Sequence, residues 1–113
     1  MQVLSHNHLP MLDKETARRI AQPLIDELAR QHGRSYVILD DAIEEHPLAW
    51  IFVFNSTEYA ASRNIMKLVM SLGPVVVKRY SGAACLAPSM MSNEFLESYL
   101  ADYEPAALPG QQA

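Results

Sequence analysis

A run of apolar residues from Ala49 to Asn55 constrains the fold of this 113-residue chain more than any other feature. Side chains alternate between two faces along a β-strand, so the run places Trp50, Phe52 and Phe54 on one face. Three rings on one face need a helix or a second sheet to remove them from water. The opposite face of the run is apolar as well, which favours a central strand over an edge strand.

The stretch Asp13–His32 is predicted to form a helix. Asp13 is a residue type that caps helix N-termini, and Gly33 is placed where a left-handed closing residue is needed. Pro23 removes one helical hydrogen bond and crowds the preceding turn, so we expect a kink or a break there. The apolar residues recur at helical spacing and are Ala17, Ile20, Ala21, Leu24, Ile25 and Leu28.

Two hairpins are expected. The first joins the extended runs Tyr36–Glu44 and Ala49–Asn55 through the turn-prone residues 45–47. The second joins Val75–Val77 to Ala83–Ala87 around Ser81-Gly82. Together they predict an antiparallel sheet of about four strands.

Two further helices are predicted after the central strand. The middle one lies within Ser56–Leu72 and ends at Gly73-Pro74, and the C-terminal one begins at Ser92 and stops at Pro105. With the N-terminal helix they are expected to cover the aromatic face of the sheet, which gives an α+β architecture. The apolar positions are Ile65, Leu68, Val69 and Leu72 in the first of these helices, and Phe95, Leu96, Tyr99, Leu100 and Tyr103 in the second.

Length and composition indicate one globular domain. A chain of 113 residues, 50% hydrophobic and 19% charged, suits a single core, which we expect in residues 13–104 between tails at 1–12 and 105–113. The single cysteine allows no internal disulfide and suits a reducing compartment. The first residues lack the pattern of a signal peptide, and no segment has the roughly 20 apolar residues that span a bilayer. We therefore expect a cytoplasmic protein.

Four carboxylates, which we call the acidic segment, stand out in the charge pattern: Asp40, Asp41, Glu44 and Glu45. Residues 35–56 contain no Lys or Arg, so these charges have no neighbour in sequence to neutralise them. One interpretation is a surface that steers a basic protein partner and fixes its register, and the other is a solvated strand end and turn. Acidity argues against nucleic acid as a partner, because phosphates require Lys and Arg.

No residue pattern predicts chemistry or a cofactor. Asp40 and Asp41 are adjacent on an extended run and point to opposite faces, which does not suit an acid-base pair. His6 and His8 have the spacing of metal ligands but lack a third or fourth ligand nearby, and Cys85 lacks a neighbouring His. We therefore expect no metal, no cofactor and no catalytic residue.

Three apolar residues are candidate anchors for a partner. Met66 and Met70 are one helical turn apart and flank the apolar face of the predicted middle helix, and Ile51 lies opposite the aromatic rings. Methionine adapts its shape to varied surfaces, so an exposed pair would mark a contact patch. Packing into the core is the alternative for both methionines.

The order of these signals resembles a known family. The chain has Trp50-Ile-Phe-Val-Phe-Asn-Ser-Thr-Glu-Tyr59, then Gly73-Pro74 before a β-branched strand, a Ser81-Gly82 turn, and Tyr99-Leu-Ala-Asp-Tyr-Glu104. From about Thr16 to Glu104 it resembles the YrhB-like immunity domain, immunity protein family thirty-five. The resemblance implies an α+β fold and a cytoplasmic, non-catalytic protein that binds and blocks a cognate toxin, with the toxin expected to be encoded by a neighbouring gene of a polymorphic-toxin system.

Two functional hypotheses follow. The first is an immunity protein that neutralises its toxin by stoichiometric occlusion, using Asp40, Asp41, Glu44, Glu45, Ile51, Met66 and Met70. The second is a chaperone-like accessory protein that binds many partners weakly through the same apolar surface. Neither hypothesis involves nucleic acid or a membrane, and homodimerisation stays open.

Overall fold

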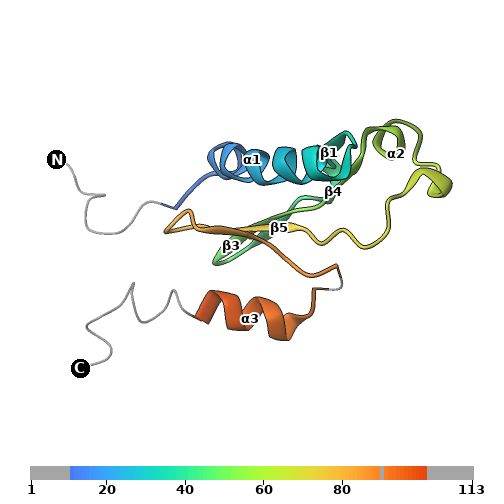
Figure 1. Ribbon diagram of the computed structural model, residues 1–113. Coiled ribbons are helices and arrows are strands. Elements are labelled where there is room, and N and C mark those ends of the chain that lie inside the picture. The colour runs from blue at the N-terminus through green and yellow to red at the C-terminus, as the bar shows by residue number, and fades with distance from the viewer. Residues whose placement is uncertain (1–10, 90, 102–113) are drawn as a thin grey trace, which may run out of the picture.

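The computed structural model describes residues 11–89 and 91–101. Strands β2, β3, β5 and β6 form a four-stranded antiparallel sheet in that order, and β1 and β4 form a two-stranded antiparallel sheet (Figure 1). The α+β prediction is therefore confirmed. The elements in chain order are α1 (Lys14–His32), β1 (Tyr36–Ile38), the 3-10 turn η2 (Asp40–Ala42), β2 (Glu44–His46), β3 (Ala49–Phe52), β4 (Phe54–Ser56), α2 (Thr57–Ser62), the 3-10 turn η3 (Ile65–Lys67), β5 (Val75–Lys78), β6 (Ala84–Leu86) and α3 (Asn93–Ala101).

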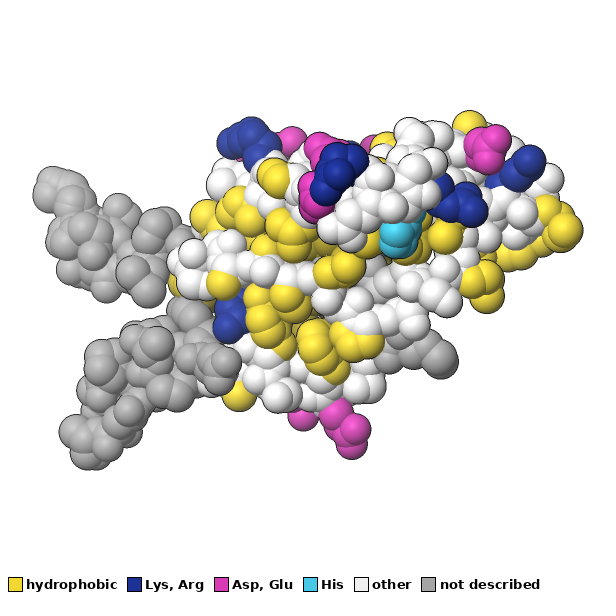
Figure 2. All heavy atoms as spheres, viewed as in Figure 1, with side chains coloured by type: hydrophobic (Ala, Val, Ile, Leu, Met, Phe, Trp, Pro, Cys, Tyr) yellow, Lys and Arg dark blue, Asp and Glu magenta, His cyan; other side chains and the backbone are white. Residues whose placement is uncertain are grey.

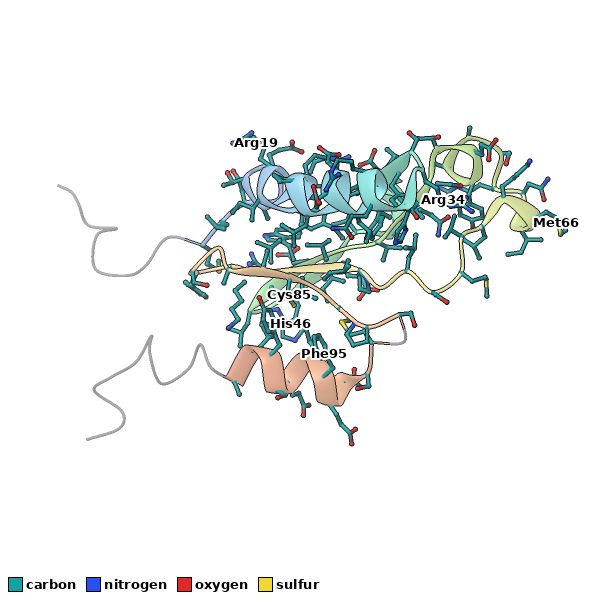
Figure 3. All side chains as sticks on the ribbon, in the orientation of Figure 1. Arg19, Arg34, His46, Met66, Cys85 and Phe95 are labelled. Carbon is teal, nitrogen blue, oxygen red and sulfur yellow. The ribbon has the colours of Figure 1, made fainter. Side chains whose placement is uncertain are left out.

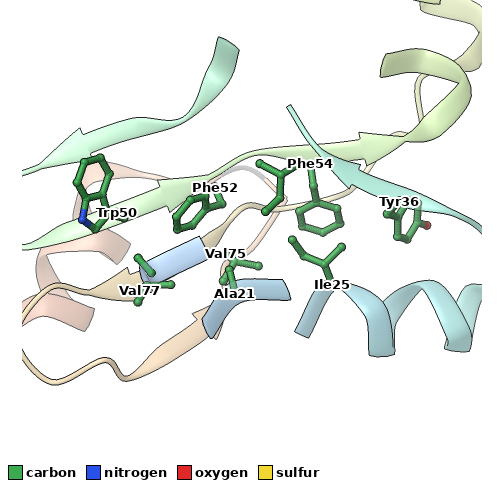
Figure 4. Packing of buried hydrophobic residues seen from close by; sticks show 10 residues of the cluster. Ala21, Ile25, Tyr36, Trp50, Phe52, Phe54, Val75 and Val77 are labelled. Carbon is green, nitrogen blue, oxygen red and sulfur yellow. The ribbon is translucent and has the colours of Figure 1, made fainter. Parts of the chain in front are cut away.

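Helices α1 and α3 cover opposite faces of the four-stranded sheet (Figure 1). The aromatic face of the central strand packs against α1, as Figure 4 shows for Phe52, Phe54 and Ile25. The other face packs against α3, where Ile51 and Val76 meet the leucines of that helix. The expectation that all helices share the aromatic face was wrong, because the apolar side chains on the second face of β3 and β5 need a cover of their own.

Helix α1 begins and ends as its sequence predicts. The Asp13 carboxylate accepts a hydrogen bond from the Thr16 N–H at 2.8 Å, which lowers the pKa of Asp13, and Gly33 closes the helix with φ 64°. The helix runs through Pro23 without interruption, so a break there was the wrong expectation. Pro23 is exposed, and the loss of one backbone donor on that side is offset by a buried face that includes Ala17, Ala21 and Ile25.

Both hairpins are present, but the first is divided. Strand β2 pairs with β3, β1 pairs with β4, and η2 separates β1 from β2. Its turn lies at residues 47–48, after a β2 strand that extends through His46. The second hairpin pairs β5 with β6, with Val76 opposite Cys85.

The middle helix is shorter than its apolar spacing predicts. Helix α2 ends at Ser62 because Arg63 adopts the left-handed conformation, with φ 56°. Asn64 then caps η3, so the predicted stripe from Ile65 to Leu72 lies on a 3-10 turn and an irregular loop. The stripe was therefore wrong as a helix face, because local side-chain caps outcompete the 3.6-residue period here.

A candidate protein-binding surface

The loop formed by residues 63–72, which we call the tip loop, exposes three large apolar side chains. Ile65 is 67% exposed, Met66 83% and Met70 72%. Figure 3 shows Met66 at one extremity of the molecule, and Figure 2 shows apolar side chains gathered at the same end. Large apolar residues scattered singly on a surface are ordinary, but three on one short loop form a patch that suits a protein contact.

Two polar side chains from the end of β4 hold the base of the tip loop. The Asn55 amide accepts a hydrogen bond from the Val69 N–H at 2.9 Å and donates one to the Val69 carbonyl at 3.1 Å. The Ser56 hydroxyl donates to the Lys67 carbonyl at 2.9 Å and accepts from the Tyr59 N–H at 3.0 Å. Asn55 and Ser56 are both buried, so the loop is fastened at its base while its apolar residues stay in solvent.

The acidic segment is paired with arginines from distant parts of the chain. Asp40 pairs with Arg18 of α1 at 2.7 Å, and Asp41 receives two hydrogen bonds from Arg63, at 2.9 and 3.1 Å. Among the described residues only Glu44 of the four carboxylates has no ion pair. The absence of Lys and Arg within residues 35–56 therefore did not leave these carboxylates unpaired, because the fold brings arginines to three of them from other elements. The remaining pair is Glu45 with Arg79, at 3.1 Å.

Asp41 is the member of the acidic segment that lies at the tip loop. Its bidentate partner Arg63 closes α2, begins the tip loop and lies over the Tyr59 ring at 5.6 Å. This fork lowers the pKa of Asp41 and raises that of Arg63, so both remain charged at neutral pH. The structure thus brings Asp41 to the base of the loop that carries Met66 and Met70.

Glu45 and Ile51 have different surroundings. Arg79 is 8% exposed and donates hydrogen bonds to the Glu45 carboxylate and to the His46 carbonyl. Its guanidinium also lies 4.8 Å from the centre of the Trp50 ring. The Glu45–Arg79 pair therefore stabilises the fold. Ile51 is 3% exposed and packs under α3, so it presents no surface to a partner in this fold. The two residues do not join the tip loop.

The region around Cys85 is built for packing. Burial raises the pKa of the Cys85 thiol and, with the hydrogen bond to that thiol, raises the pKa of Tyr99 to about 12. The Lys78 ammonium lies 4.4 Å from the centre of the Tyr99 ring, a cation–π contact between β5 and α3. A protonated, half-buried thiol is a poor nucleophile.

Within residues 11–89 and 91–101 no three His, Cys, Asp or Glu side chains gather into a group able to hold a metal ion. His6 and His8 lie outside the described residues. In the same part of the chain no helix is long and apolar enough to cross a membrane.

Sequence reasoning missed the residues that organise this surface: Asn55, Ser56, Arg63 and Arg79. A polar Asn-Ser pair at the end of an otherwise apolar run was a readable signal that these side chains hold a neighbouring loop. The arginine pairings had no such signal, because Asp41 and Arg63 are 22 residues apart and Glu45 and Arg79 are 34 apart.

Comparison with curated proteins and with solved structures finds no match. The model of one family, described as Immunity protein 35, matches residues 15–102, which include every described element apart from the first residue of α1. This agrees with the resemblance seen in the strand and turn motifs. The chain belongs to the immunity protein 35 family.

Proposed function

We propose that this chain neutralises a cognate bacterial toxin by binding it stoichiometrically in the cytoplasm, with the tip loop as the main contact. Family membership implies toxin neutralisation. The observation that carries the proposed site is the exposure of Ile65, Met66 and Met70 on a loop whose base is held by buried side chains. The chain would act by covering a functional surface of the toxin and would catalyse nothing.

A fastened loop is suited to tight binding. Ordering a loose loop on association costs free energy, and the hydrogen bonds of Asn55 and Ser56 to the tip loop reduce that cost in advance. Full burial of a methionine contributes roughly 1.5 to 3 kcal/mol. Since Met66 is 83% exposed, its burial against a toxin would contribute about 1.2 to 2.5 kcal/mol.

The exposed carboxylates of η2 and β2, of which Asp41 lies at the base of the tip loop, favour a basic surface on the toxin. Asp41 is 65% exposed at its side chain and Asp40 is 76% exposed, so both present oxygens to solvent despite their arginine partners. Glu44 adds an exposed carboxylate with no ion pair to a described residue. Such charges raise association rates and fix register more than they add affinity, and the apolar anchors supply the affinity.

The first test is co-purification of the tagged chain with the product of the neighbouring gene, together with growth of cells that express that product. We expect one tight complex and restored growth. Met66→Ala should weaken the complex by about 7- to 60-fold, the equivalent of the 1.2 to 2.5 kcal/mol estimated above for burial of Met66. Met11→Ala is the matched control, because Met11 is 51% exposed and lies outside the tip loop.

Two results would contradict this proposal. Equal affinities for Met66→Ala and the unmodified chain would remove the tip loop as the contact. Weak binding to many unrelated proteins, with no protection from any neighbouring gene product, would favour the chaperone-like accessory protein, which would use the same methionines as an adaptable surface.

A further inference from the structure

The two edges of the four-stranded sheet differ in how they are protected. Strand β2 forms one edge and consists of Glu44, Glu45 and His46, followed by Pro47, which are residue types that discourage edge-to-edge pairing. Strand β6 forms the other edge, and residues 81–92 around it contain no charged side chain. The β6 edge therefore lacks the charged side chains that protect the β2 edge.

The backbone register shows which groups β6 offers. The Ala87 N–H donates to the Pro74 carbonyl and the Lys78 N–H donates to the Ala83 carbonyl, both at 2.8 Å. Peptide groups alternate in direction along an antiparallel strand, so Cys85 also turns its N–H and carbonyl toward β5. Those of Ala84 and Leu86 consequently point away from the sheet, where no hydrogen bond to a described residue engages them.

An apolar groove of about 380 Å³ lies beside this edge, between α1 and β6. Pro23, Leu24, Leu28 and the 41% exposed Leu86 line it. The one carboxylate in its lining, Glu27, is already bonded by Arg30 and Gln31. Figure 2 shows apolar side chains between α1 and α3 on the face viewed, and Figure 3 places Cys85 in the same region.

We propose that β6 is a self-association edge, where a second copy of this chain adds its own β6 antiparallel and extends the sheet across a two-fold axis at Cys85. This register uses every outward group: Ala84 of each copy exchanges two hydrogen bonds with Leu86 of the other. Cys85 then faces its counterpart in a pair without mutual hydrogen bonds. The interface is isologous, since the same patch serves both copies.

Charge and shape both favour a second copy as the occupant. A two-fold axis places two identical strands side by side, so like charges on this edge would face each other and repel, and β6 carries no charge. The β6 strand of the second copy would lie about 4.8 Å from this one, so the second copy also covers the groove that opens beside Leu86. Leu86 and the leucines of α1 then leave water together.

Sedimentation of the full chain measures the proposed state. At roughly 100 μM, where even a Kd of that order pairs half of the chains, we expect a mass well above 12.7 kDa that approaches twice this value as concentration rises. Leu86→Lys should return the mass to that of one chain with an unchanged circular dichroism spectrum, since the side chain is partly exposed. Met66→Lys, which introduces the same charge at the tip loop, should leave the dimer intact.

Amide hydrogen exchange identifies the surface. In the dimer the Ala84 and Leu86 amides should exchange slowly, and Leu86→Lys should release them. A dimer in which these amides exchange fast would be a dimer through another face and would overturn the proposal. A monomer in which the Ala84 and Leu86 amides exchange slowly would also overturn the proposal, because the chain would then cover its own edge. A monomer in which exchange of these amides slows only when toxin binds would overturn it as well.

Discussion

Asn55→Ala tests whether the tip loop is held from its base. Asn55 is 6% exposed and makes three side-chain hydrogen bonds, two with Val69 and one from the Ser56 N–H at 2.8 Å. At a net 0.5 to 1.5 kcal/mol each, their loss amounts to roughly 1.5 to 4.5 kcal/mol. We expect about 2 to 3 kcal/mol, because Val69 is only half-buried and water can reach its backbone.

Urea unfolding, followed by the fluorescence of the single tryptophan, measures this loss. Asn64→Ala is the matched control, since Asn64 is exposed and makes one capping hydrogen bond, to the Met66 N–H at 2.9 Å. The control should cost about 1 kcal/mol or less.

Hydrogen exchange adds a local readout. In Asn55→Ala the Val69 amide should exchange much faster, whereas the amides of β3 and β5 should change only as far as global stability falls. Equal costs for the two asparagine variants, or a Val69 amide that stays protected, would refute the view that Asn55 fastens the loop.

Three further outcomes are expected. Phe52→Ala, which truncates a fully buried ring, should lower the free energy of unfolding by about 3 to 5 kcal/mol in the same urea assay, and less than 1 kcal/mol would remove Phe52 from the core. Gly73→Ala should destabilise the domain strongly in thermal unfolding, because the new Cβ would meet the Ala87 carbonyl oxygen at 1.9 Å, whereas Gly33→Ala meets no atom within 4 Å and bears only the left-handed backbone cost of roughly 1 to 2 kcal/mol. The pKa of Tyr99 is raised from 10.0 to about 12, so the folded state favours the neutral phenol. The contribution of this shift to stability is complete below pH 10 and is lost as pH rises through 12. Tyr99→Phe should therefore remove this part of the alkaline loss of stability when the free energy of unfolding is measured over a pH series.

The sequence predicted the elements whose signals are local and repeated. Asp13 and Gly33 marked the ends of α1, and the alternation through Trp50, Phe52 and Phe54 identified the strand at the centre of the sheet. Periodicity failed between residues 63 and 72, where the left-handed Arg63 and the Asn64 cap end regular structure before the apolar spacing can act. A hydrophobic period records which positions are apolar but does not show that a core faces them.

The residues of the candidate surface could be predicted only in part from the sequence, for a related reason. The exposure of Met66 and Met70 depends on where η3 places them, and the pairing of Asp41 depends on an arginine brought from another element. Ile51 was taken for an anchor because it lies opposite the aromatic rings, and the structure fills that side with α3. Which face of a strand is covered is a tertiary property that alternation alone does not state.

Because α1 and α3 lie on opposite faces of the sheet, each residue of β3 and β5 has one helix against which its side chain packs. All four residues of each strand are buried, and neighbours along a strand belong to different helices. Inserting or deleting one residue here would send the indole of Trp50 into the space shaped for Ile51 and exchange every following side chain in the same way. Length changes are thus poorly tolerated within the strands, whereas the irregular loop beyond Arg63 can absorb them without exchanging the two faces of β3 and β5.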